Sequence, residues 1–410
     1  MRFKAIACAT IIFLAVTAQH IRAQSPADES IKLGAEALQQ HDYDAAILHF
    51  SGCIHVGHPT MLSQCYLSRG LAYYLKGQYS SAISDFTDAL KDRNLDQDSV
   101  FLLYQNRGNA YNKSAQYRAA IDDYNAAAKI RGTAEIFCNR GLAYFDLGQK
   151  DEAIADFTRA VNIDPSYSSA YYNRGLLHFE KKNLDASITD YTNAIKAKPN
   201  YPEAYYNRGV SYIYQNKFDL ALADYNSALS LNPNYAKAYH NRATLYARQN
   251  QYDLAIADLS KSIELDSSTP LFLVNRGNVY MQQSKWDLSF ADYQKAIELS
   301  PNDVTALRGR GSIFSIRGKY DEAIADFSKA ISLDDTNATA FFLRGLSNYQ
   351  QKKYDLALPD FTKAIALNPA YKVAYQFRAN TYRATGQTNL ASLDDAKVSN
   401  IGTSASPAKP

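Results

Sequence analysis

The pentapeptide "YYNRG" occupies residues Tyr171–Gly175 and returns unchanged at Tyr205–Gly209, thirty-four residues later. Its arginine recurs before a Gly or an Ala along the chain, and from Arg140 onward the spacing is 34 residues every time. A fixed period of this size indicates a solenoid of stacked repeats. The recurring arginines are Arg69, Arg107, Arg140, Arg174, Arg208, Arg242, Arg276, Arg310, Arg344 and Arg378.

Each period is predicted to contain two helices. Within residues 168–201, Tyr171 and Gly175 lie on one stripe at helical spacing, and a second stripe that includes Tyr191 follows the polar stretch "EKKNLD". Pro199 ends the second stripe because proline cannot continue the helical hydrogen-bond ladder. The sequence therefore predicts an all-α fold built from antiparallel helix pairs that pack face to face.

This pattern resembles the tetratricopeptide repeat (TPR) family. In one period the family's order of an aromatic residue, Gly, Tyr, Ala, an aromatic residue, Ala and Pro is matched by Tyr205, Gly209, Tyr212, Ala221, Tyr225, Ala228 and Pro233. The resemblance covers residues 27–399 and implies a right-handed superhelix of helix pairs with a concave groove. The chain departs from the family pattern in one respect, because it has Arg where the family usually has Leu.

Each recurring arginine is followed by an aspartate sixteen positions later. Arg174 and Asp190 lie at equal offsets from the packed stripes of their helices, so the two can meet across the hairpin. We interpret them as structural ion pairs that set the helix register, in preference to catalytic or ligand-binding carboxylates, because ten copies recur. The central pairs are Arg174 with Asp190, Arg208 with Asp224, and Arg242 with Asp258.

An asparagine stands directly before the arginine in six consecutive periods. On a helical wheel Asn173 lies about 160° from the centre of its packed stripe, and the family resemblance places that face on the concave groove. A ladder of carboxamides offers the donors and acceptors that an extended polypeptide requires. We therefore predict peptide binding by Asn106, Asn139, Asn173, Asn207, Asn241 and Asn275, with Tyr172 and Tyr206 as aromatic contacts. The alternative is that Asn is a tolerated polar residue in a regular array.

The ends of the array differ from its middle. The first unit has Leu33 and His49 where later units have Arg and Asp, and the last unit has Asp395 in place of an aromatic residue. Both features are typical of capping repeats. We expect a repeat superhelix over residues 24–399, with about ten repeats plus capping units, and a disordered tail over residues 400–410.

The N-terminus is interpreted as a targeting segment. A short basic start precedes an apolar run over residues 5–18, which is too short to span a bilayer comfortably. Residues 1–23 are predicted to be a signal peptide cleaved after Ala23; cleavage after Ala18 and a retained membrane anchor are the alternatives. The prediction is an exported protein of bacterial type, periplasmic or secreted, with no membrane span after cleavage.

Charge argues against nucleic acid or anionic lipid as the partner. The formal net charge is +3, and cleavage after Ala23 would remove three basic residues and no acid, leaving a neutral chain. A binder of polyanions normally shows a basic excess. Enzyme motifs such as HExxH, GxSxG and a Walker loop are absent. We therefore predict a non-enzymatic interaction scaffold that needs no cofactor and binds a protein or peptide partner.

Cysteine and histidine gather near the first repeat. In an exported protein a disulfide between Cys53 and Cys65 is permitted. The stretch "CIHVGH" at residues 53–58, together with His41 and His49, suggests the alternative of a metal-binding accessory protein. Its spacing fits no known zinc finger, so no metal ligand is assigned.

Overall fold

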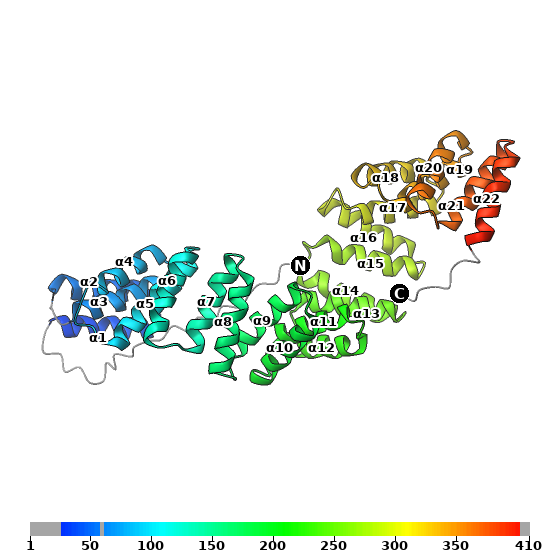
Figure 1. Ribbon diagram of the computed structural model, residues 1–410. Coiled ribbons are helices and arrows are strands. Elements are labelled where there is room, and N and C mark those ends of the chain that lie inside the picture. The colour runs from blue at the N-terminus through cyan, green and yellow to red at the C-terminus, as the bar shows by residue number, and fades with distance from the viewer. Residues whose placement is uncertain (1–25, 58–60, 402–410) are drawn as a thin grey trace. The chain divides into compact units, whose positions relative to one another are not determined.

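The computed structural model describes residues 26–57 and 61–401, which form α-helices and no strand (Figure 1). The predicted all-α fold is confirmed. The predicted signal peptide lies outside the described residues, as do residues 402–410 of the predicted tail, whereas Asn400 and Ile401 belong to the last helix.

The chain divides into two compact units, with the boundary between Leu231 and Asn232. The helices of the first unit are α1 (Pro26–Gln39), α2 (Tyr43–Val56), α3 (Leu62–Leu75), α4 (Tyr79–Ala89), α5 (Gln97–Lys113), α6 (Tyr117–Ile130), α7 (Ala134–Asp146), α8 (Lys150–Ile163), α9 (Ser168–Glu180), α10 (Leu184–Ala197), α11 (Pro202–Tyr214) and α12 (Phe218–Leu231). Those of the second are α13 (Ala236–Arg248), α14 (Tyr252–Leu265), α15 (Pro270–Gln282), α16 (Trp286–Leu299), α17 (Val304–Ile316), α18 (Tyr320–Leu333), α19 (Ala338–Gln350), α20 (Tyr354–Leu367), α21 (Lys372–Ala384) and α22 (Thr388–Ile401).

Within each unit every odd-numbered helix packs against the even-numbered helix that follows it, and each such hairpin packs against the next one. Successive odd-numbered helices also touch one another, for example α3 with α5 and α13 with α15. The odd-numbered helices therefore share a continuous face in each unit. None of the helices in the described ranges has the length and apolar character needed to cross a bilayer.

A close contact between a glycine and an aromatic ring holds the two helices of a hairpin together. A Cβ atom built on Gly175 would lie 2.9 Å from Cε1 of Tyr191, a ring that is fully buried. Ordinary carbon contacts are longer, so a larger residue would push the helices apart. The repeat with Ala243 has the smaller Leu259 at the position of the ring, and both are buried in one cluster. The recurring glycine is thus matched to the ring that it faces.

Each hairpin turns through one residue with a positive φ angle. Glycine occupies four of these turns, because it adopts the left-handed region without steric cost. The other turns use larger residues, which accept the strain. The turn residues are His41, Gly77, Ala115, Gly148, Lys182, Asn216, Asn250, Ser284, Gly318, Lys352 and Gly386.

Candidate functional site

The recurring arginines and aspartates form bidentate ion pairs within their hairpins. Arg174 donates from Nε to Oδ2 of Asp190 at 2.9 Å and from Nη2 to Oδ1 at 2.7 Å. Across the ten pairs the aspartate side chains are 2% to 9% exposed and the paired arginines 11% to 26%. The planar guanidinium matches the carboxylate at both oxygens. These carboxylates therefore serve packing.

A third hydrogen bond of the arginine, which was not among the predicted contacts, joins neighbouring hairpins. Nη1 of Arg174 donates to Oγ1 of Thr158 in the preceding even-numbered helix, at 3.0 Å. The sequence signal is a Thr, Ser, Asn or Gln two residues after each aspartate that is followed by a further repeat. The other acceptors are Ser51, Thr87, Asn125, Thr192, Ser260, Gln294, Ser328 and Thr362.

The two ends of the array lack half of this connection. In the first hairpin Leu33 replaces the arginine, but Ser51 still accepts the bond from Arg69 of the second hairpin. In the last hairpin Ala396 stands where the acceptor would be. The first hairpin thus keeps only the acceptor, which faces the second hairpin. The last hairpin keeps only the arginine, which faces the hairpin before it.

Aromatic rings flank the guanidinium groups. Arg208 lies over the ring of Tyr205 at 5.6 Å and over that of Tyr212 at 6.0 Å. A cation above a ring face is stabilised by the ring quadrupole. The many tyrosines of the chain thus support the ion pairs as well as the hydrophobic packing.

The asparagines before the arginines are placed differently from the free ladder that was predicted. Asn106, Asn139, Asn173 and Asn207 are buried, while Asn241 and Asn275 are half-buried. A single-helix wheel accounts only for the partner helix of the same hairpin, whereas successive odd-numbered helices also contact one another.

Several of these carboxamides bond to the preceding odd-numbered helix. Nδ2 of Asn139 donates to Oδ1 of Asn109 at 3.2 Å, and Nδ2 of Asn207 donates to Oη of Tyr172 at 2.9 Å. Tyr172 and Tyr206, the predicted aromatic contacts, are each 3% exposed. These residues therefore form part of the packing between repeats.

His240 connects the same face in the second unit. Its Nδ1 lies 3.1 Å from Oδ1 of Asn241, and its Nε2 lies 2.6 Å from Nδ2 of Asn275. Because a carboxamide oxygen only accepts and its nitrogen only donates, the neutral ring with hydrogen on Nδ1 satisfies both contacts. Burial lowers the pKa of His240, which favours this neutral form.

A group of buried polar atoms on or beside the odd-numbered helices of the first unit has no hydrogen-bond partner among the described residues. Gln105 is 1% exposed, and both its amide nitrogen and its amide oxygen are unbonded. One turn later on α5, Asn109 is 3% exposed and its nitrogen is unbonded, although its oxygen accepts from Tyr124 at 2.7 Å. Further unbonded atoms are Oδ1 of Asn207, Nδ1 of His178, the amide oxygen of Gln215 and the hydroxyl of Tyr191.

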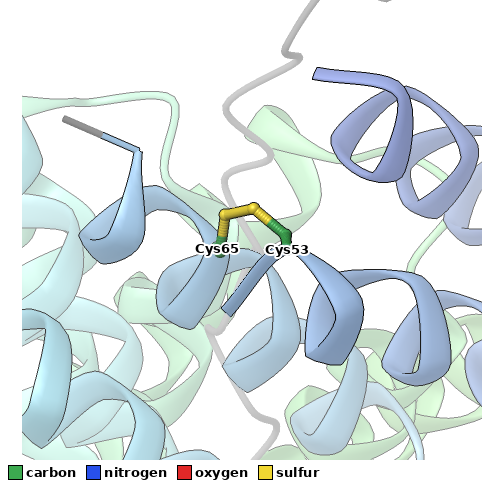
Figure 2. The surroundings of a disulfide bond; sticks show 2 residues. All are labelled: Cys53 and Cys65. Atoms are coloured by element: carbon green, nitrogen blue, oxygen red, sulfur yellow. A yellow bond between two sulfur atoms is a disulfide. The ribbon is translucent and has the colours of Figure 1, made fainter. Parts of the chain in front are cut away.

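Cys53 of α2 and Cys65 of α3 are joined by a disulfide, with their Cα atoms 6.1 Å apart (Figure 2). The bond ties the first hairpin to the second, where the first hairpin lacks the recurring ion pair. Its sulfur atoms are therefore not free thiolates for a metal. Over residues 26–57 and 61–401, no group of three or more His, Cys, Asp or Glu side chains is arranged to hold a metal ion. His58 lies outside the described residues.

Comparison with known proteins assigns the family. A model described as TPR repeat matches residues 141–182, 175–213, 277–315 and 311–352, and two described as tetratricopeptide repeat match residues 202–235, 236–268 and 338–371, and residues 102–133. Together these matches cover more than half of the chain. The chain belongs to the tetratricopeptide repeat family, and this repeat class supports a role as a protein-interaction scaffold.

Several solved structures are similar to the chain. A tetratricopeptide repeat protein from Parabacteroides merdae is 22% identical, covering 63% of this chain and 98% of its own, with a TM-score of 0.46. The C-terminal part of a TPR repeat-containing protein from Cytophaga hutchinsonii is 20% identical, with 58% and 97% coverage and a TM-score of 0.49. YrrB, described as a TPR protein with an unusual peptide-binding site, is 26% identical, with 45% and 95% coverage and a TM-score of 0.40. No curated protein matches the chain.

Proposed function

We propose that the protein is a non-enzymatic scaffold that binds an extended peptide or protein segment along the odd-numbered helices of its first unit. The observation that carries the proposal is the buried amide of Gln105, whose nitrogen and oxygen both lack partners. Leaving a buried donor or acceptor unbonded costs about 1–3 kcal/mol. Because both atoms are buried, a ligand reaches them only when the neighbouring side chains move aside, and it then recovers this free energy by supplying both partners.

An extended peptide has the required chemistry. Each peptide unit carries one N–H donor and one C=O acceptor, and a primary carboxamide can accept from the first and donate to the second. Asn109 adds a donor one turn away on the same helix, and Asn207 adds an acceptor on α11. These groups would bond to the backbone of the ligand and not to its side chains. The proposed contact therefore tolerates ligands of varied sequence.

The proposed contacts differ from the predicted ladder. Asn139, Asn207 and Asn275 bond to the preceding odd-numbered helix, and among them Asn207 retains an unbonded carbonyl for a ligand. Gln105 occupies the position just before Asn106; the same repeat position holds Gln376 in the last hairpin, where the side chain is exposed, and other residue types elsewhere. Recognition therefore centres on α5, with the ladder asparagines acting mainly as supports.

The proposed setting is the bacterial periplasm or the extracellular space, reached through the N-terminal signal peptide. The disulfide between Cys53 and Cys65 supports this setting, because such bonds persist in oxidising compartments and are rare in the cytosol. Intact mass spectrometry after thiol alkylation, on protein isolated from each compartment, tests the location. A full-length chain with both thiols alkylated, recovered from the cytosol alone, would contradict it.

Selection from a random library of 12-residue peptides, followed by fluorescence anisotropy, tests the binding proposal. Gln105→Leu should weaken the selected peptides about tenfold, since one or two buried hydrogen bonds contribute about 1.4 kcal/mol. Gln97→Leu, at an exposed position on the same helix, is the matched control and should change the affinity less than twofold.

A backbone substitution in the ligand makes the test specific. Replacing one peptide bond with an ester removes a single N–H, and the ester that faces Gln105 should weaken binding to the wild type but not to Gln105→Leu. If no ester position distinguishes the two proteins, or if both glutamine variants bind alike, the proposed contact is wrong.

A further inference from the structure

In the second unit the charges are sorted between the two sets of helices. Its five odd-numbered helices, α13, α15, α17, α19 and α21, contain no aspartate or glutamate, whereas each of its even-numbered helices contains at least two. In the first unit the odd-numbered helices carry acids such as Glu135 on α7 and Glu203 on α11. The odd-numbered face of the second unit is therefore distinctly less acidic.

Basic residues remain on this face after the ion pairs are counted. The arginines that recur with the period are neutralised by their aspartates. Lys237 on α13 and Arg308 on α17 form no ion pair at contact distance within the described part of the chain, although Lys237 lowers the pKa of Asp266 and Arg308 lowers that of Asp334. The face thus has positive charge that no described residue neutralises at contact distance.

Arg308 stands at a position that is uncharged in the other repeats with the recurring arginine, where residues such as Gln105, Tyr172, Tyr206 and Phe342 occur. It is half-buried on α17, so its charge is less screened than that of a fully exposed residue. Arg308 is therefore the specific feature of this face.

Tyr293 and Asp334 lie within electrostatic range of Arg308. The next residue, Gly309, has no side chain, and a Cβ atom there would lie 2.4 Å from Cζ of Tyr293. Burial raises the pKa of Tyr293 to about 12, and the positive charge of Arg308 partly offsets that rise. The nearby carboxylate of Asp334 is hydrogen-bonded by Thr336. The charge of Arg308 thus acts on both Tyr293 and Asp334, and it lowers the pKa of each.

We propose that the odd-numbered face of the second unit binds an acidic protein segment, with Arg308 as the anchor for a carboxylate and Lys237 as a second contact. A guanidinium binds a carboxylate in a bidentate manner. Apolar and amide groups lie exposed on the same face: Leu271 is 50% exposed, and Asn278 is exposed. The surface thus offers the mixed contacts of a protein interface.

A peptide fits this face better than nucleic acid does. Nucleic-acid binders contact several phosphates through many Lys and Arg side chains, whereas this face provides few unpaired cations among apolar residues. The formal net charge of the chain is only +3. The acidic segment uses residues of the second unit alone, so this proposal is independent of the Gln105 contact.

Fluorescence anisotropy with the full-length protein tests the proposal. The probe is a fluorescein-labelled 12-residue peptide of alternating Glu and Gly, and the reference has Gln in place of Glu. The acidic peptide should bind at least tenfold more tightly than the reference in 50 mM NaCl, and its affinity should fall at 300 mM NaCl. Arg308→Gln should reduce the affinity about tenfold and Lys237→Gln about threefold.

Matched variants separate the site from general charge effects. Arg308→Lys keeps the charge but loses the bidentate geometry, so its affinity should lie between those of the wild type and Arg308→Gln. Lys329→Gln removes one exposed charge from the even-numbered helix α18 and should change the affinity less than twofold. Gln105→Leu should leave the acidic peptide unaffected, which distinguishes this site from the one in the first unit. Circular dichroism checks that each variant remains helical.

Three results would overturn the proposal. One is equal binding of the acidic and neutral peptides. The second is equal loss of affinity with Arg308→Gln and Lys329→Gln. The third is a labelled 12-nucleotide RNA that binds more tightly than the acidic peptide and loses its affinity with Arg308→Gln, which would assign the face to nucleic acid instead.

Discussion

Replacing Arg174 with Leu, the residue usual in the family at this position, should strongly destabilise the hairpin of α9 and α10. The change removes the hydrogen bonds at 2.9 Å and 2.7 Å to Asp190 and leaves that carboxylate, only 3% exposed, without its counter-ion. Removing one partner of a buried ion pair costs roughly 3–5 kcal/mol. Because Arg174 is itself 17% exposed, solvent screening reduces the expected cost to about 2–4 kcal/mol.

Hydrogen exchange of the full-length protein, followed by mass spectrometry, measures this loss locally. It suits a long repeat array, which need not unfold in one step. A loss of about 3 kcal/mol corresponds to a roughly 150-fold faster exchange of amides in α9 and α10 if they exchange by local opening. Helices α1 and α2, at the far end of the same unit, should be unaffected.

A double variant and a surface control decide whether the buried charge is the cause. Arg174→Leu combined with Asp190→Leu removes both charges and should recover most of the stability, because an apolar pair can replace a buried ion pair. Lys181→Leu breaks the exposed pair with Asp151 and should cost less than about 0.5 kcal/mol. The reasoning fails if Arg174→Leu behaves like Lys181→Leu, or if the double variant is as unstable as the single one.

Three further predictions concern other contacts. Thr158→Ala removes the acceptor of Arg174 in the preceding hairpin and should speed exchange in α9 about fivefold, since this hydrogen bond contributes about 1 kcal/mol. Pro359 lies inside α20, where proline lacks the backbone donor. Pro359→Ala should therefore raise the free energy of opening of α20 by about 1 kcal/mol and slow hydrogen exchange there. Burial lowers the pKa of His240, so its stabilising contribution should be present above the unfolded pKa of about 6.5 and be lost as the pH falls through the lower folded value. Thermal unfolding at pH 7.5 and pH 5.0 should show a smaller difference for His240→Gln than for the wild type.

Each of these has a control. Thr189→Ala changes an exposed threonine of α10 whose hydroxyl bonds only within its own helix, and it should leave α9 unchanged. Unchanged exchange in α20 of Pro359→Ala would show that the chain has adapted fully to the proline. If His240→Gln and the wild type show the same pH dependence of thermal unfolding, His240 does not cause that dependence.

The helix pairs and the ion pairs were predictable because they depend on short, fixed separations. A hairpin brings residues sixteen apart into contact, so Arg174 and Asp190 could be paired from the sequence. The acceptor Thr158 could have been found in the same way, since a hydroxyl or amide follows each aspartate by two residues wherever another repeat comes after it. Its absence at Ala396 is equally visible in the sequence.

Gln105 and Arg308 could not be found by this method. Arg308 occurs once at its repeat position, and Gln105 recurs there only as the exposed Gln376, so the period singles out neither residue. The importance of Gln105 comes from its burial without partners, and that of Arg308 from charge left unpaired by the described residues around it. Both properties depend on which neighbouring side chains approach, and no helical wheel contains that information.

The period, the helix pairs, the register within each pair and the two ends of the array can be read from the amino-acid sequence, because they follow from contacts inside one hairpin or between one hairpin and the next. The environment of the face beyond the hairpin depends on how the repeats stack. Successive odd-numbered helices contact one another there, so Asn139 and Asn207 bond to neighbouring helices while Gln105 is left with an unused amide. A helical wheel gives only the direction in which a side chain leaves its own helix. The burial of that side chain depends also on the angle at which the next repeat stacks.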